Sequence, residues 1–277
     1  MAEVSAGLPL PVAVASRLIP GLGARRAPAG PPGLSPYDTA GLALAYDLLM
    51  PGSAVYDGSD RVERLVNFSS IANCDATQAS NSFKPVYEPT GLNGRPCIKA
   101  DGGGDFMDLG GGALSLTQNI AAWTEIFVGQ TTSTAGATVR WGFSTNGNVT
   151  RIALGINAGQ ERILQRRLDT DGQTVTFLGA RATGIYVSSR DVNFATGLLR
   201  GWDNGAALTP AGSGPSGGNT SNTASTRARL FANLAESPGG PASFRLGARY
   251  CWPRLLTDDE RNGITQRLGF LWGLTVS

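Results

Sequence analysis

The middle of the chain is a series of short alternating segments separated by two-residue turn signals. Residues 137–144 alternate apolar and polar side chains, an Asn-Gly pair follows at 146–147, and residues 150–156 alternate again. A second turn pair, Asp-Gly, stands at 171–172 between two further strand patterns. Asn-Gly and Asp-Gly favour type I′ turns, because both central residues of such a turn need positive φ. These residues therefore predict antiparallel hairpins.

Further strand patterns flank these hairpins, and one helix closes the chain. Expected strands lie at 41–49, 62–69, 95–101, 122–130, 162–168, 174–180, 184–202, 228–234 and 243–252. Thr257 and Glu260 form a capping box that predicts a helix over 257–272, with Gly273 suited to the residue after its end. About ten to thirteen strands and one helix predict an all-β, two-sheet antiparallel sandwich, each strand having one face in the core and one in water.

The N-terminal region has a different composition. Residues 1–36 are rich in proline, glycine and alanine, which favours an extended chain without a core of its own. We expect an assembly arm over 1–36 and one β-sandwich domain over 37–277. Burial of the arm's apolar residues against a neighbour would give a homo-oligomer, such as a trimer, or attachment to a larger particle. The alternative is that the arm folds back on its own domain. Glu3 and several prolines interrupt the apolar start, so no signal peptide is expected.

The absence of histidine excludes more types of catalytic and metal site than any other feature of the sequence. With none in 277 residues, Ser-His-Asp and Cys-His catalysis and His-based metal sites are excluded. The three cysteines, Cys74, Cys97 and Cys251, are far apart and predict buried free thiols. A net charge of +2 without a basic stripe gives nucleic-acid binding no support. The sequence also lacks an apolar run long enough for membrane insertion.

Carboxylate catalysis would need two acids in a recognisable arrangement. Retaining glycosidases hold two carboxyl groups ~5 Å apart, and no glutamate here has an acidic partner two residues away on a predicted strand. Glu125, in the middle of the strand pattern at 122–130, is the only candidate. An outward polar residue is the better interpretation, so we expect no enzymatic activity.

Two clusters are candidates for ligand binding. Asp101, Asp105 and Asp108 flank three glycines and form a weak Ca²⁺ candidate. The favoured alternative is a glycine-rich turn in which aspartate caps backbone amides, so neither a metal nor a cofactor is expected.

The second cluster is Trp202, Asp203 and Asn204, which places an aromatic ring, an acid and an amide at a loop. Aromatic faces and planar amides suit glycan binding through stacking and hydrogen bonds. The favoured alternative is a hairpin turn whose tryptophan belongs to the core.

Three stretches resemble the concanavalin A-like, laminin-G-like jelly-roll domains of bacterial surface proteins and phage structural proteins. In 65–78, Asn67, Ser69, Asn73, Asp75, Ala76 and Gln78 match the family's early strand and loop, whereas Leu65 and Ser70 replace the usual Trp and Gly. Residues 92–109 are similar to its Asn-Gly-x-Pro segment, and residues 251–274 resemble its closing strand and helix. The resemblance spans 37–277 and implies a two-sheet jelly roll without fixing a ligand.

The resemblance and the arm together favour a non-enzymatic bacteriophage virion protein, such as a head fibre, decoration protein or tail-fibre component. Such a protein would be made in the bacterial cytoplasm, join other virion proteins through the arm, and carry a lectin-like jelly roll that contacts host-surface polysaccharide. The alternative is a free carbohydrate-binding module of a bacterial surface. A polysaccharide hydrolase is the third hypothesis, which the missing histidine and the missing acid pair oppose.

Overall fold

A computed structural model describes residues 32–277, apart from 134–136, 145–149, 169, 173, 181–182, 213, 215–216, 219, 223–224 and 233–242. Most of the predicted arm and the Asn-Gly pair at 146–147 therefore lie outside the described residues. Within them the strands form three antiparallel sheets, two large and one of two strands. The arm's assembly role stays a prediction.

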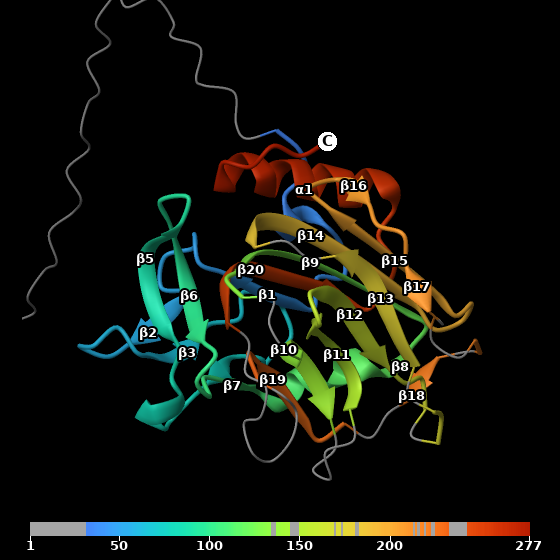
Figure 1. Ribbon diagram of the computed structural model, residues 1–277, viewed down its shortest axis with the longest axis horizontal. Helices are drawn as coiled ribbons and strands as arrows, with labels where there is room; N and C mark the ends of the chain where they lie inside the picture. The colour runs from blue at the N-terminus through green and yellow to red at the C-terminus, as the bar shows by residue number, and fades with distance from the viewer. Residues whose placement is uncertain are drawn as a thin grey trace, which may run out of the picture. The chain divides into compact units, whose positions relative to one another are not determined.

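The first large sheet contains the longest strands of the molecule (Figure 1). Its order is β16 (Ala206–Ala207), β15 (Leu198–Asp203), β14 (Gly184–Asn193), β9 (Ala122–Thr131), β20 (Ser243–Trp252), β6 (Arg95–Asp101) and β5 (Val86–Leu92). The strand β1 (Leu44–Asp47) pairs with the C-terminal half of β20, beside the part that pairs with β6.

The second large sheet faces the first across the core. Its order is β17 (Ala211–Gly212), β13 (Thr174–Ala180), β12 (Gln160–Gln165), β11 (Thr150–Asn157), β10 (Ala137–Ser144), β19 (Arg227–Leu230), β7 (Met107–Leu109), β4 (Ala76–Thr77), β3 (Val62–Leu65) and β2 (Ala54–Tyr56). The rings of Trp123 on β9 and Trp141 on β10 meet between the sheets with their centroids 5.2 Å apart. The predicted two-sheet antiparallel sandwich is confirmed.

Short elements complete the described part. The third sheet pairs β8 (Gln118–Ile120) with β18 (Ser221–Asn222), and 3-10 turns occupy η1 (Pro36–Asp38), η2 (Asn81–Phe83) and η3 (Gly111–Thr117). Several strands of two or three residues, such as β4 and β16, have no sequence pattern of their own. The structure therefore contains more strands than the sequence predicts.

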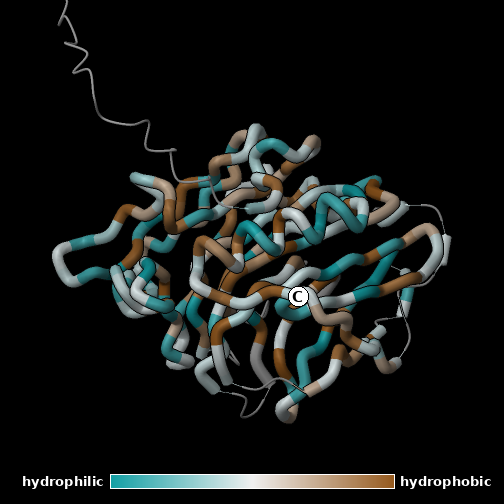
Figure 2. The backbone as a smooth tube through the Cα atoms, turned by 90° about the horizontal axis from the view of Figure 1, so that it is seen from above, coloured by the Kyte–Doolittle hydropathy of each residue, from teal (hydrophilic) through white to brown (hydrophobic). Residues whose placement is uncertain are grey.

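The C-terminal helix α1 (Asp258–Trp272) forms a third layer over the outer face of the first sheet (Figure 1). The predicted capping box is present, since Thr257 Oγ1 accepts from the Glu260 amide and Glu260 accepts from the Thr257 amide. Gly273 follows in the left-handed region at φ 68°. Seen from above, hydrophilic and hydrophobic segments alternate along the helix (Figure 2).

This layer changes the environment of β9. The predicted alternation along the strand is right, but residues 122–129 are all buried. Helix α1 covers the side of the sheet that was expected to face water, and Trp272 packs against Gly247 of β20 so closely that a Cβ there would lie 2.3 Å from the indole ring. The expectation of one solvated face is wrong for this strand.

Residues shared with the jelly-roll family fix the connection between strands. Asn67 Oδ1 accepts a hydrogen bond from the Ala45 amide at 2.8 Å, and Ser69 Oγ donates to the Ala43 carbonyl at 2.7 Å. Asp75 Oδ1 accepts from the Asn67 amide at 2.9 Å. These polar side chains tie β1 to the segment after β3, which explains their place in the motif.

The three cysteines are buried free thiols, as expected, and burial raises the pKa of Cys97 and of Cys251 to about 12. Thiols held neutral in this way are poor nucleophiles. Within the described residues, no helix combines the length and apolarity needed to cross a bilayer.

Candidate functional site

The predicted glycan-binding residues Trp202, Asp203 and Asn204 lie at the end of β15 and in the turn after it. Trp202 pairs with Ser189 of β14, and Asp203 pairs with Ser188. Consecutive side chains of a strand point to opposite faces of the sheet. The structure therefore does not bring the indole ring and the carboxylate to one surface.

The polar groups of these three residues have partners within the chain. The Arg261 guanidinium lies over the Trp202 ring, 3.7 Å from its centroid. Asp203 Oδ1 accepts from Arg190 Nη2 at 3.0 Å. Asn204 Oδ1 accepts from a β14 amide at 2.9 Å, and its φ of 48° fits the predicted turn. Glycan binding here remains a prediction, and each of the three residues has a structural role.

Asp203 belongs to a buried ionic cluster between the sheets. Glu161 of β12 accepts from Arg190 Nε at 2.8 Å and from Arg140 Nη1 at 3.1 Å. Glu161, Arg190 and Arg140 are each at most 2% exposed. Two guanidinium groups and two carboxylates balance in charge, which is the condition for holding ions inside a core.

Glu125 occupies a second buried pair, and its expected outward position is wrong. It is fully buried on the inner face of β9, where Oε1 accepts from Arg249 Nε at 2.5 Å. The Arg249 guanidinium lies 4.3 Å from the centroid of the Trp141 ring. Burial raises the pKa of Glu125 to about 7, although Arg249 and Arg190 oppose the shift. Enclosure in the core keeps this carboxyl away from any external substrate.

The three aspartates of the calcium candidate are not gathered into one site. Asp108 pairs with Arg229 at 2.7 Å. Asp101 Oδ1 accepts from the Gly103 amide at 2.6 Å, and Asp105 Oδ2 accepts from the Asp101 amide at 3.1 Å. Among the described residues, no group of three or more His, Cys, Asp or Glu side chains could hold a metal ion. These contacts match the alternative of a capped turn.

A different surface combines exposed aromatic rings with a cavity. Tyr56 of β2 and Tyr87 of β5 stack in parallel, with centroids 4.5 Å apart and an interplanar angle of 8°. Strands β2 and β5 end their respective sheets, so this pair joins the two sheets at one side of the sandwich. Tyr56 is 45% exposed. Part of its side chain is therefore accessible to solvent.

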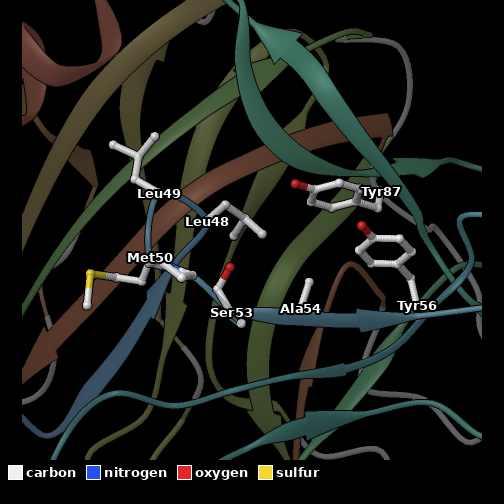
Figure 3. Close-up of a pocket in the computed structure, with 9 residues that line it drawn as sticks. Leu48, Leu49, Met50, Ser53, Ala54, Tyr56 and Tyr87 are labelled. Carbon is white, nitrogen blue, oxygen red and sulfur yellow. The ribbon is translucent and has the colours of Figure 1, made fainter. Parts of the chain in front are cut away.

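The cavity lies between this pair and the loop after β1. It measures about 220 Å³ and is lined by Leu48, Leu49, Met50, Pro51, Gly52, Ser53, Ala54, Tyr56 and Tyr87. Figure 3 shows both phenol groups pointing toward the loop, with Ser53 beneath them. None of these lining residues is an acid or a base other than the two phenols. Burial raises the pKa of Tyr87, so its hydroxyl stays protonated and able to donate a hydrogen bond.

The loop has a defined conformation because its sequence encodes a turn. Met50-Pro51-Gly52-Ser53 forms a type II turn, in which the Ser53 amide donates to the Met50 carbonyl at 3.2 Å and Gly52 has φ 75°. Proline presets φ at the second position, and glycine tolerates positive φ at the third. The wall of the cavity is therefore organised before any ligand arrives.

Asp47 fixes the start of this loop. Its Oδ1 accepts from the Leu49 amide at 3.0 Å. Its Oδ2 accepts from the Tyr250 hydroxyl at 2.7 Å and from the Tyr37 hydroxyl at 3.2 Å. One buried carboxylate thus links the loop to β20 and to η1.

Sequence reasoning missed this site. Tyr56 and Tyr87 fall outside the predicted strands, and β5 contains Pro89 and Gly91, which weaken its strand pattern. The signal that was available is the Pro51-Gly52 turn pair before an aromatic residue. It predicts a turn, but it does not reveal which residue of the other sheet completes the site.

Comparisons with known proteins identify the fold and no family. No protein-family model matches the chain, and no curated protein matches it. Among solved structures, a Trypanosoma rangeli sialidase in complex with 2,3-difluoro-KDN matches 83% of this chain at 15% identity, with a TM-score of 0.55. The chain spans 33% of that sialidase.

Botulinum neurotoxin type C, which interacts with two ganglioside molecules, matches 82% of this chain at 10% identity, with a TM-score of 0.54. The chain spans 51% of the matched toxin chain. A CBM40 of the Ruminococcus gnavus IT-sialidase, bound to α2,3-sialyllactose, covers 61% of this chain and 95% of its own length at 17% identity, with a TM-score of 0.49. Together with the sheet order, the sialidase and toxin matches show the fold, a two-sheet antiparallel jelly-roll β-sandwich.

Proposed function

We propose that this chain is a non-catalytic carbohydrate-binding module that holds a neutral saccharide at the cavity beside Tyr56 and Tyr87. The observation that carries the proposal is the parallel tyrosine pair, with Tyr56 exposed and both hydroxyls directed into that cavity. A pyranose ring presents an apolar face of C–H groups and a rim of hydroxyls. The Tyr56 ring matches the apolar face, while the phenols and Ser53 match the hydroxyl rim.

The lack of charge at the cavity supports a neutral ligand. Sialic acid carries a carboxylate, which arginine recognises well through its planar fork of donors. No arginine or lysine lines the cavity. The ligands of the sialidase and of the neurotoxin therefore do not transfer to this site, and the shared fold supports only a scaffold suited to presenting such a surface.

Absence of catalysis is part of the proposal. Glycoside hydrolysis needs a pair of carboxyl groups at the sugar, and no carboxylate lines this cavity. Glu125 and Glu161 lie in the core and are bound by arginines. We expect the purified protein to release no oligosaccharide from bacterial capsule or lipopolysaccharide.

Binding to an array of neutral, sialylated and uronic-acid glycans tests the proposal. The wild-type chain should bind neutral glycans, and Tyr56→Ala should weaken that binding by about tenfold or more, because a stacked aromatic anchor carries much of such an affinity. Leu198→Ala is the matched control, since Leu198 is an exposed apolar residue on β15 that lines none of the cavities described. Equal binding by Tyr56→Ala and wild type would overturn the proposed site.

A second candidate is a virion structural role, in which the same module is carried on a bacteriophage particle. Its support is the sequence resemblance to phage jelly-roll proteins and the proline-rich composition of residues 1–36. It is compatible with glycan binding, since a particle-borne module would contact the host surface. The protein composition of purified particles tests it, and absence of this chain from every such particle would reject it.

A further inference from the structure

The cavity beside Tyr56 shares a wall with a second cavity, which in turn shares a wall with a third. The second, of about 190 Å³, is lined by Tyr37 and Tyr250 and has Leu49 and Met50 in common with the first. The third, of about 350 Å³, is lined by residues 37–42 and 68–70 and has Tyr37 in common with the second. Met50 and Tyr37 thus stand at the two boundaries along one continuous row.

We infer that this row is an extended binding groove for a glycan chain of several units, with Tyr56 and Tyr37 stacking against different sugar rings. The inference rests on the proposed function and adds that the recognised ligand is a chain segment, with more than one ring held. A single ring fits beside the Tyr56–Tyr87 pair. The neighbouring cavities offer space for the units on one side of it.

Exposed apolar side chains occur along this row. Among the described residues, six large hydrophobic side chains are exposed, and three of them line these cavities: Tyr37 at 37%, Met50 at 37% and Tyr56 at 45%. The other three, Val55, Leu198 and Phe270, lie on β2, on β15 and on helix α1. Concentrated exposed apolar surface is typical of a binding site, whereas isolated exposed residues need no explanation.

Tyr37 is held ready to stack. Its ring packs edge-on against Tyr250 at a centroid distance of 5.9 Å, and its hydroxyl donates to Asp47. The same Asp47 carboxylate accepts from the Leu49 amide and so orients the loop that carries Met50. Fixing both residues before the ligand binds reduces the entropy lost on binding. Asp47 is therefore a positioning residue for the groove.

Charge along the row also favours a neutral chain. Asp38 lines the third cavity, and Asp47 and Arg267 both line the second, so the row has acids and a base but no run of basic residues. A polyanionic glycan would meet the Asp38 carboxylate at one end and no base at the Tyr56 end. A linear neutral chain meets hydroxyls and aromatic faces along most of the path.

The test uses the full chain and ladders of cello-, chito- and malto-oligosaccharides from disaccharide to hexasaccharide, with affinity measured by calorimetry. We expect affinity to rise with chain length by about tenfold or more in the series that binds, since each added contact of ~1.4 kcal/mol is a factor of ten. Tyr37→Leu should remove most of that rise and leave disaccharide affinity unchanged. Tyr37→Phe, which keeps the ring and loses only the bond to Asp47, should retain most of the rise.

Each other outcome has a distinct meaning. A length-dependent affinity that Tyr37→Leu does not alter would overturn the groove, because the chain would then run in another direction. Equal affinity at every length would overturn the groove and leave the Tyr56 site intact. Binding to none of the three series, with no neutral glycan bound on the array, would overturn the groove together with the proposed function.

Discussion

Two regions of this molecule combine aromatic rings with polar groups, but they differ in what surrounds those groups. At the end of β15, the Trp202 ring lies under the Arg261 guanidinium, and the neighbouring Asp203 carboxylate binds Arg190 of the buried ionic cluster. At the edge formed by β2 and β5, Tyr56 and Tyr87 stack on each other beside a cavity without charged walls. In the first region the polar groups bind other residues of the protein, whereas in the second they line a cavity that a ligand can enter.

The difference shows that residue type alone does not decide whether a cluster forms a binding site or structural contacts. Trp, Asp and Asn at a loop have the composition of a sugar site, yet strand alternation and local arginines turn them into structural contacts. The tyrosine pair is not marked out by the sequence around it, but it lies beside an open cavity. Accessibility of the ring face therefore identifies the better site, and it depends on which elements meet in the fold.

The largest expected effect comes from the ionic cluster behind Asp203. Glu161→Gln keeps the side chain's size but removes the charge that Arg140 and Arg190 share. Leaving buried guanidinium groups without their carboxylate should lower the free energy of unfolding by about 3–5 kcal/mol, measured by urea denaturation. Asp259→Asn, at an exposed position in the first turn of helix α1, is the control and should lower it by about 0.3–1 kcal/mol. A loss for Glu161→Gln no larger than the control's would mean that the cluster is not a structural core element.

The next effect separates the buried carboxyls of the core from the Tyr56 cavity by their response to pH. Burial raises the folded-state pKa of Glu125 to about 7, above its usual 4.5, so folding favours the protonated carboxyl. The resulting stability is fully present below pH ~4.5 and is lost as pH rises to ~7, a change of about 3 kcal/mol. Melting curves across this window measure it, and Glu125→Gln should reduce the slope. Burial also raises the pKa of Asp105, to about 6. A smaller dependence of stability on pH, in the same direction, should therefore remain in Glu125→Gln.

Glycan affinity should stay constant across the same pH range. No carboxylate or histidine lines the Tyr56 cavity, and Tyr87 remains a neutral phenol. A binding constant that fell in parallel with stability would show that the ligand depends on the buried carboxylates. That result would break the contrast between the two regions.

Local patterns predict much of this fold. The capping box places helix α1 to within a residue, and the alternation of 122–130 correctly predicts a strand there, although not the inward position of Glu125. Both features depend on residues close in sequence. The helix layer over β9 depends instead on how two distant elements pack, so the burial of both faces of the strand could not be read from its own pattern.

The candidate site shows the same limit more strongly. Glu125 looks like a surface acid until Arg249, 124 residues later, comes to lie beside it. Tyr56 and Tyr87 come together because β2 ends one sheet and β5 ends the other. The sequence encodes the turn at Pro51-Gly52 locally, but the pairing of the sheet edges is a property of the whole sandwich.

A smaller effect tests whether the cavity loop is organised in advance. Gly52→Ala places a Cβ in open space, but φ 75° is unfavourable for alanine, so stability should fall by about 1 kcal/mol. Glycan affinity should fall with it, as the turn that carries Met50 and Ser53 shifts. Gly58→Ala is the matched control, because that glycine also faces open space and does not have positive φ. Unchanged affinity in Gly52→Ala, measured by calorimetry, would show that binding does not need this turn conformation.

The smallest effect is expected at the tryptophan that sequence composition singles out. Trp202→Phe keeps an aromatic ring beside Arg200 and Arg261, so loss of cation–π contact should cost only about 0.5 kcal/mol of stability. Affinity for a neutral glycan should remain within about twofold of wild type, because a change below ~0.4 kcal/mol corresponds to that ratio. Tyr56→Ala measured beside it should lose about tenfold. A large loss in Trp202→Phe with little change in Tyr56→Ala would move the glycan site to the end of β15 and reverse the assignment of the two aromatic regions.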